Sequence, residues 1–348
     1  MTRGTVPDPV AAARAVLREV ALPRPCTVVA AMSGGADSAA LALVLHHLSA
    51  ELEMRVVGAH YDHGIRDAAS RAAERAAVRE QCARLGVALH EGGAGDGELH
   101  QRRRATGRSL EELARERRYG FLLAVAASCG AAAVAVGHHL DDNLETILMR
   151  ALQGSLRGGG IAARSGPVLR PLLNVRREEL RRCVAEARLP VMEDPGNADP
   201  AMLRNRVREL LPALEAAVPG TARNLPLLAH GGAAAWRELV ARSRRAVPWR
   251  YARDARWGSH YRVAAGLFWG APAEVRQAAL YQAWDAVTSR GVSGRRDRAR
   301  LPRGFLQPLL AERVPPRRLL TAGHGVCIAC DLRTVVVARR RAAPADAH

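Results

Sequence analysis

Residues Cys26 to Ser38 read CTVVAAMSGGADS, and this stretch decides the fold. Cys26 to Met32 are mostly apolar and β-prone, and the helix-like segment AALALVLHHLSA follows Ser38. An apolar run, a glycine turn and a helical pattern in this order predict a buried strand, a tight turn and a helix N-terminus. Gly34 and Gly35 tolerate positive φ and allow the backbone to approach a ligand closely.

The loop from Ser33 to Ser38 has the properties of an anion site. Its freed backbone amides, two serine hydroxyls and the helix dipole converge on an anion, with phosphate the leading candidate. It is not a Walker A motif, because GxxxxGK[ST] requires a lysine and all 52 basic residues of the chain are arginine. Taken alone, the loop is also compatible with a plain strand-to-helix turn.

Further β-prone segments at 55–59, 87–90 and 131–136 alternate with helical patterns of ten or more residues. This alternation predicts an α/β fold with a doubly wound parallel sheet, whose ligand crevice lies at the carboxyl ends of the strands. The motifs HYDHGIR and GHHLDDNLET each follow a predicted strand. We therefore expect them to share one site with the SGGADS loop. Residues 91–96 are predicted to form a glycine-rich loop, and the basic segment up to Gly107 to be irregular.

With 348 residues, the chain is long enough for two or three domains. The pattern predicts an α/β domain over 1–200, a helical region over 201–248, a small α+β domain over 249–340 and a disordered tail over 341–348. No run approaches 18 apolar residues, so a membrane span is not expected. The N-terminus is a poor signal peptide and reads as an amphipathic helix from Pro9, which indicates a cytoplasmic protein.

The net charge is +18 and the isoelectric point is near 11. Such a basic excess indicates a polyanionic partner, with nucleic acid the leading candidate. A GC-rich genome would explain arginine in place of lysine, but not the excess over acidic residues. Six scattered cysteines are expected to be free thiols. Cys327 and Cys330 form a lone CxxC, for which metal binding, redox chemistry and simple strand packing remain open.

Opening ATP at its α-phosphate requires a held pyrophosphate, a magnesium ion and a placed acceptor. The SGGxDS form of the loop resembles the pyrophosphate-binding loop of enzymes that split ATP between its α and β phosphates. This resemblance implies that the SGGADS loop holds the pyrophosphate, and Asp37 is a natural Mg²⁺ ligand. The turn carrying His60, Asp62, His63 and Arg66 suits contact with nucleotide or substrate, although a solvated Asp–His turn is the alternative.

In GHHLDDNLET, two histidines precede three carboxylates on one helical turn. This composition suits either a metal site or recognition of an ammonium group. Asp142 and Glu145 are three residues apart and share a helix face. A helix dipole would explain the acidic N-terminus, but not the histidines before it.

Six blocks occur in the order found in tRNA(Ile)-lysidine synthases: SGGADS, HYDHGIR, LARERRYGFL, GHHLDDNLET, RPLLNVRREEL and EDPGNADPAMLRNRVRELLPAL. The chain resembles this family closely over 24–216. The resemblance implies an N-type ATP pyrophosphatase (PP-loop) catalytic domain, then a tRNA-contacting region and a substrate-binding domain, in a homodimer. It also implies a reaction. ATP adenylates carbon 2 of the wobble cytidine in tRNA(Ile) with a CAU anticodon. The ε-amine of free L-lysine then displaces AMP.

Site residues follow from the matching positions. The resemblance implies that ATP and Mg²⁺ bind at Ser33, Gly34, Gly35, Ala36, Asp37, Ser38, His60, Asp62 and His63, with Asp37 on the metal. It implies catalytic roles for Asp37, Arg118, His138, Asp142 and Glu145, of which the last two hold the lysine amine. It assigns nucleotide or tRNA contacts to Arg204, Arg206 and Arg208. The chain departs from the family at Asn143 for glutamine, at Gln153-Gly154 for Arg-Gly and at Gly196 for serine, which affects loop detail.

Three other readings are weighed against this one. A PP-loop tRNA thiolase would use catalytic cysteines or an iron-sulfur cluster, and the α/β region has no CxxC. An amidotransferase-coupled synthetase would need a glutaminase domain, which the sequence lacks. A non-catalytic RNA-binding protein would explain the charge but not the intact loop and carboxylates.

Overall fold

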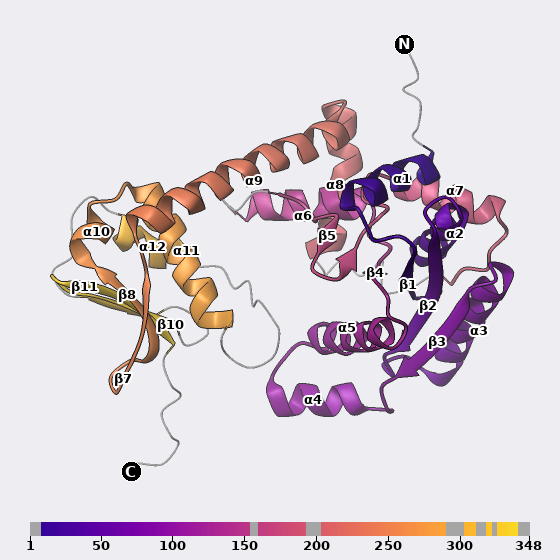
Figure 1. The fold of residues 1–348 in the computed structure, drawn as a ribbon, viewed down its shortest axis with the longest axis horizontal. Coiled ribbons are helices and arrows are strands. Elements are labelled where there is room, and N and C mark those ends of the chain that lie inside the picture. The colour runs from indigo at the N-terminus through magenta and orange to yellow at the C-terminus, as the bar shows by residue number, and fades with distance from the viewer. Residues whose placement is uncertain are drawn as a thin grey trace. The chain divides into compact units, whose positions relative to one another are not determined.

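The structure is a computed structural model that describes residues 8–153, 159–192, 203–289, 303–310, 318–321 and 326–339. The chain divides into a first compact unit that ends at His230 and a second that begins at Gly231 (Figure 1). The stretch 201–248, predicted as one helical region, contains two helices over 203–217 and 221–246 with a turn between them, and the division falls within the second. The predicted tail over 341–348 lies outside the described residues.

The first unit is built on a six-stranded sheet of order β3-β2-β1-β4-β6-β5. Its strands are β1 (Cys26–Met32), β2 (Met54–Asp62), β3 (Ala88–Gly93), β4 (Ala133–Ala135), β5 (Arg164–Ser165) and β6 (Val168–Leu169). All are parallel except β5, which runs antiparallel at the edge. Because β1 lies between β2 and β4, the segments that follow these three strands emerge at the same edge of the sheet.

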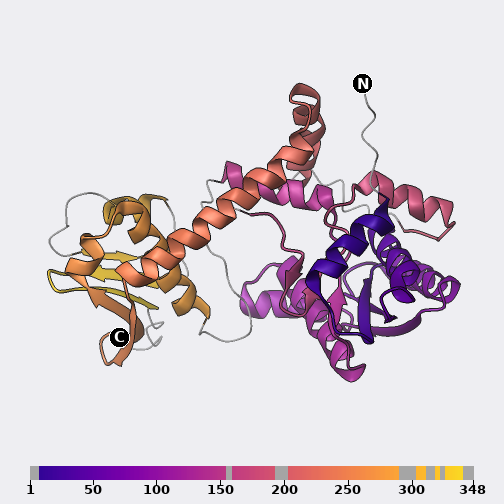
Figure 2. The same ribbon diagram turned by 45° about the horizontal axis from the view of Figure 1, so that its top comes forward.

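Helices cover both faces of this sheet, as Figures 1 and 2 show. Those in contact with its strands include α2 (Ala36–Ser49), α3 (Ala68–Arg84) and α5 (Leu110–Ser128). The other helices up to Ala246 are α1 (Pro9–Val20), α4 (Glu98–Thr106), α6 (Leu140–Leu152), α7 (Arg177–Glu186), α8 (Leu203–Ala217) and α9 (Thr221–Ala246), and α9 continues into the second unit. Alternate residues of β1 point to opposite faces. Val28 belongs to the cluster packed with α1, α2 and α7, and Val29 to the cluster packed with α5. The predicted doubly wound α/β fold is therefore confirmed.

Two local predictions in this unit are wrong. Residues 91–96 were predicted as a loop, but β3 continues to Gly93, where it pairs with Asp62 at the end of β2. The basic segment before Gly107 is the helix α4 rather than irregular chain. Arginine is a good helix former, buried Leu99 anchors the helix, and Gly107 ends it with φ +66°.

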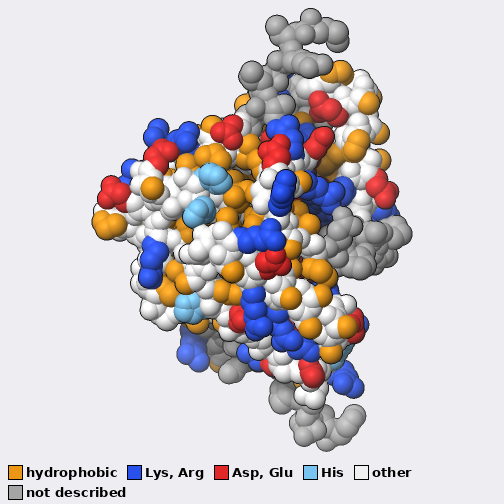
Figure 3. All heavy atoms as spheres, turned by 90° about the vertical axis from the view of Figure 1, so that its right-hand side faces the viewer, with side chains coloured by type: hydrophobic (Ala, Val, Ile, Leu, Met, Phe, Trp, Pro, Cys, Tyr) orange, Lys and Arg blue, Asp and Glu red, His pale blue; other side chains and the backbone are white. Residues whose placement is uncertain are grey.

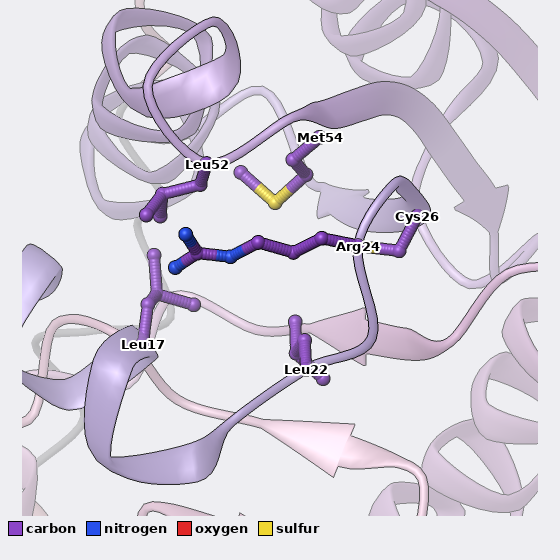
Figure 4. A pocket seen from close by; sticks show the side chains of 6 residues that line it. All are labelled: Leu17, Leu22, Arg24, Cys26, Leu52 and Met54. Carbon is purple, nitrogen blue, oxygen red and sulfur yellow. The ribbon is translucent and has the colours of Figure 1, made fainter.

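A small pocket lies at the amino ends of β1 and β2, at the opposite edge of the sheet from the SGGADS loop (Figure 4). It is lined by Leu17, Leu22, Arg24, Cys26, Leu52 and Met54. The stem of Arg24 crosses it between apolar side chains, as long basic side chains commonly do. We assign this pocket to packing between α1 and the sheet.

The second unit contains an antiparallel sheet of order β7-β8-β11-β10-β9. Its described elements are β7 (Arg250–Asp254), β8 (Gly258–Ala264), α10 (Ala265–Trp269), α11 (Ala273–Ser289), α12 (Arg303–Leu310), β9 (Arg318–Thr321), β10 (Val326–Cys330) and β11 (Thr334–Arg339). Phe268, Leu280 and Trp284 pack on one face of the sheet and form a core with it. This arrangement confirms the predicted small α+β unit.

The two cysteines of the CxxC serve strand packing. Cys330 belongs to the core under the helices, whereas Cys327 belongs to a separate cluster with Val336 and Ala338. Residues three apart in a strand point to opposite faces, so these thiols do not form a pair. Among the helices that the structure describes, none is long and apolar enough to cross a membrane.

Candidate functional site

The SGGADS loop joins β1 to α2 in a compact, internally bonded turn. Gly34 has φ +74°, and a β-carbon there would lie 3.2 Å from Glu74 Cγ. The Ser38 hydroxyl accepts from the Ser33 amide at 3.1 Å and donates to the Gly35 carbonyl at 2.9 Å. No side chain caps the start of α2 at Gly35. The first-turn amides of α2 therefore lack an internal acceptor, which is the property of a helix N-terminus that binds phosphate.

A glutamine of α3 donates a hydrogen bond to the backbone of this loop. The sequence offered no reason to select it. Gln81 of α3 is fully buried, and its Nε2 donates to the carbonyls of Gly34 at 3.1 Å and Pro190 at 2.6 Å. The amide of Met192 donates to the same Gly34 carbonyl at 2.9 Å. Because C=O and N–H point in opposite directions across a trans peptide, these bonds also orient the Gly35 amide away from α3. In the sequence, the only signal that could have separated Gln81 from a surface glutamine is its position in the helical segment α3.

The GHHLDD segment after β4 lies directly against the loop. A β-carbon on Gly137 would be 2.8 Å from the carbonyl oxygen of Asp37. His139, fully buried at the N-cap of α6, forms a capping box with Asp142. His139 Nε2 also lies 3.6 Å from Asp37 Oδ2. Two of the three predicted motifs thus meet, and His139, for which we predicted no role of its own, is their link.

Asp37 has the properties of a metal-binding carboxylate. Burial would raise its pKa, but His139, together with the charges of Arg177 and Arg181, outweighs burial and lowers the pKa. Its side chain is 39% exposed, so an ionised carboxylate faces an accessible site. No cluster of three or more potential metal ligands occurs among the described residues. Mg²⁺ bound with nucleotides commonly takes one or two carboxylates plus phosphate oxygens, and Asp37 fits that requirement.

Asp142 and Glu145, the carboxylates predicted to hold the lysine amine, lie together, and both form ion pairs with arginines of α8. Arg204 donates to Asp142 Oδ1 and to Glu145 Oε2, each at 2.6 Å, and Arg208 donates to Glu145 Oε1 at 2.7 Å. Glu145 is fully buried. Burial alone would lower the pKa of Arg204, but Glu145 and Asp142 outweigh burial and raise it. Arg206, predicted with Arg204 and Arg208, is exposed.

His138 lies beside this acidic cluster. Its Nδ1 accepts from Arg170 Nε at 3.3 Å. Burial lowers the pKa of His138 to about 4, and Arg170, Arg115 and Arg204 act in the same direction while Asp142 opposes them. The ring is therefore neutral at pH 7. Sequence reasoning missed Arg170, whose only signal was its place in the RPLL block.

Arg118 is a half-buried cation that has no carboxylate partner in the described part of the chain. Its guanidinium carbon lies 5.7 Å from the Tyr119 ring. Burial lowers its pKa, as does the nearby Arg115. Its charge in turn lowers the pKa of His63, after burial as the larger cause, to about 4. A buried guanidinium of this kind is suited to an anionic ligand.

The HYDHGIR segment was predicted as a turn, but its first three residues complete β2 and pair with β3. Its polar side chains have two roles. His60 is buried, and its Nδ1 lies 3.2 Å from the carbonyl of Met32, next to the loop. Asp62 instead accepts from the Gly64 amide at 2.9 Å and from Arg71 Nε at 2.9 and 3.0 Å. Among described residues, no contact joins Asp62 to Ser33–Ser38. Asp62 therefore stabilises the segment from the end of β2 to Gly64. Its side chain is only 10% exposed, so this segment is not the solvated Asp–His turn that was the alternative from the sequence.

Comparison with known proteins gives several relatives. A tRNA(Ile)-lysidine synthase of Thermus thermophilus is 41% identical over 207 residues, which are 59% of this chain and 39% of that protein. One of Nitratidesulfovibrio vulgaris is 37% identical over 233 residues, 65% of this chain and 66% of that protein. The chain therefore spans about two fifths of the Thermus relative.

A U34-tRNA thiolase from Methanococcus maripaludis, solved with its [4Fe-4S] cluster, has a TM-score of 0.51 at 19% identity. That similarity covers 64% of this chain and 77% of the thiolase, and it extends to the fold alone. The family model described as a PP-loop domain matches residues 11–214, which include the loop, His139 and the acidic cluster. This chain belongs to the PP-loop family.

Proposed function

We propose that this chain is a tRNA(Ile)-lysidine synthase acting in the cytoplasm. It uses ATP to adenylate the wobble cytidine of tRNA(Ile) with a CAU anticodon, and then joins the ε-amine of free L-lysine to carbon 2 of that base. AMP and pyrophosphate leave, and the codon read changes from AUG to AUA. The homodimer that the resemblance implies is part of this proposal.

One observation carries the proposal: the SGGADS loop, called the phosphate loop from here on, packs against the GHHLDD segment at one edge of the sheet. Gly137 abuts Asp37, and the helix that starts at His139 presents Asp142 and Glu145. The loop amides would hold the pyrophosphate, and Asp37 would hold Mg²⁺, which supplies charge neutralisation when bound. The acidic pair would orient the lysine ammonium and take a proton from it, since only the neutral amine attacks. The names of the relatives support the same reaction.

The RNA part of the proposal is supported by a run of exposed arginines. Arg102, Arg103 and Arg104 of α4 are all exposed, and no ion pair involves them among the described residues. Figure 3 shows one face of the molecule, where blue basic side chains are interspersed with red acidic ones. Exposed guanidinium groups suit an RNA backbone, because each can form bidentate bonds to phosphate.

The thiolase alternative would need a cysteine near the loop. Cys26 lies at the amino end of β1, and Cys129 at the far end of α5. Burial raises the pKa of the Cys82 thiol to about 11, which makes this side chain a poor nucleophile. This cysteine is part of the hydrophobic core of the first unit, and Cys183 on α7 packs against the same core. We therefore favour ligation over sulfur transfer.

The test is direct. The full chain is incubated with ATP, Mg²⁺, labelled lysine and a CAU-anticodon transcript, and the RNA is digested to nucleosides. We expect label on the wobble cytidine and one AMP per lysine incorporated. Sulfur transfer in a parallel reaction, without lysine label, would instead establish thiolation. RNA binding without AMP release would establish the non-catalytic alternative.

A further inference from the structure

Arg170 follows β6 and is almost completely buried, with 8% of its surface exposed. Its Nη1 donates to the Ala162 carbonyl at 2.9 Å, and its backbone amide donates to the Ala163 carbonyl at 2.8 Å. The first bond holds the guanidinium and the second holds the backbone of Arg170, and Nε donates to His138 Nδ1 at 3.3 Å. A guanidinium stays protonated and can only donate. His138 Nδ1 must therefore offer its lone pair, which places the ring proton of the neutral imidazole on Nε2.

We propose that Arg170 is a positioning residue that holds His138 in the Nε2–H tautomer beside the Asp142–Glu145 cluster. The charged groups that face the ring are Arg170, Arg115, Arg204 and Asp142. Three of these four are cations, so they disfavour a second proton on the ring. No described protein atom accepts a hydrogen bond from Nε2, which leaves this N–H to donate to a ligand.

This assignment limits what His138 can do. With Nδ1 engaged, the ring cannot take a proton there without losing the Arg170 bond. Its available role is to donate from Nε2 to an oxygen of the nucleotide or of the base. This donor role toward nucleotide or base rests on the proposed function, whereas the assignment of the tautomer does not.

The experiment measures the tautomer without any reaction. The full chain is labelled with ¹⁵N-histidine, and the His138 ring resonances are assigned by comparison with His138→Gln. For the unmodified chain we expect a protonated Nε2 and an unprotonated, hydrogen-bonded Nδ1 at pH 7. In Arg170→Met the aliphatic stem remains but the donor and charge are lost. The Nδ1 resonance should then move, the second tautomer should appear, and the protonation midpoint of His138 should rise by about one unit or more.

Arg177→Met is the matched control. Arg177 Nε lies 3.2 Å from His139 Nε2, so the same change is made at the neighbouring histidine. It should shift the His139 resonances and leave those of His138 in place. Arg170→Lys keeps a cation but cannot reproduce the planar fork. It should move the His138 signals in the same direction by less, and it carries the test if Arg170→Met does not fold.

Two results would overturn the assignment. The first is a proton on His138 Nδ1 in the unmodified chain. The second is a folded Arg170 variant in which the His138 resonances and protonation midpoint are unchanged. Neither depends on lysine ligation, so failure of the proposed reaction would leave the tautomer result standing.

Discussion

Replacing Gly137 by alanine should damage the phosphate loop through one added methyl group. The new β-carbon would lie 2.8 Å from the Asp37 carbonyl oxygen, 3.1 Å from its carbonyl carbon and 3.4 Å from the Ser38 amide nitrogen. All three are backbone atoms, so no side-chain rotation relieves the contact. Either the loop or the segment before α6 must move by several tenths of an ångström.

The magnitude follows from overpacking. Inserting a methyl group into a well-packed site costs about 1–3 kcal/mol, and we expect Gly137→Ala to lower the free energy of unfolding by that amount. Displacement of the Asp37 and Ser38 amides should also weaken ATP binding. A loss of about 1.4 kcal/mol there corresponds to a tenfold higher Kd. Urea denaturation measures the first quantity, and titration calorimetry with ATP measures the second.

Gly120→Ala is the matched control, because it adds the same methyl group inside α5. Nothing lies within 4 Å of that added carbon, and alanine is favoured over glycine in a helix by about 0.5–1 kcal/mol. This variant should be slightly more stable and should bind ATP normally. If Gly137→Ala behaved like Gly120→Ala in both measurements, the close packing of the two motifs would be refuted.

Three other predictions use the same principles. The free energy of unfolding should fall as the pH falls from 6.5 to 4, because the pKa of His63 is about 4 in the folded chain and the unfolded state binds more protons in that window. In urea denaturation, His63→Gln should make this fall shallower. An unchanged pH dependence in the variant would contradict the lowered pKa of His63. Changing Arg102 to Arg104 together to glutamine should reduce the slope of log K against log salt in tRNA filter binding by about 2–3, whereas an equal slope would place the RNA elsewhere; Arg14 and Arg18, paired with Glu51, are the control. Arg204→Gln should lower the KM for lysine relative to that for ATP if the guanidinium competes with the amine; a higher lysine KM would contradict the competition.

The fold was predictable because it depends on short-range patterns. The run Cys26–Met32 and its glycine turn identify β1 and the start of α2, and β2, β3 and β4 are each followed by a helix in the same way. Helix α4 was missed because its only buried residue is Leu99, so the apolar periodicity that indicates a helix is absent there.

The site was predictable in its residues but not in their partners. The motifs name Asp37, His138 and Glu145, since these lie within recognisable local patterns. Gln81 and Arg170 contact the site from 47 and 32 residues away along the chain, and such contacts exist only after folding. For the same reason the sequence could not show that Asp62 pairs with arginines of α3.

The acidic pair shows what folding adds to the chemistry. Each of its four carboxylate oxygens already accepts a bond: Asp142 from Arg204 and the His139 amide, and Glu145 from Arg204 and Arg208. Both oxygens of buried Glu145 are bonded to arginines, so a lysine ammonium can bind there only if one arginine moves away. Keeping the arginine and the ammonium together beside one buried carboxylate would remove both cations from water, which is costly. The Arg204 side chain is 40% exposed and that of Arg208 26%. Arg204 can regain water more easily, so the amine site, if it opens, should open on the Arg204 side while Arg208 keeps α8 attached to α6.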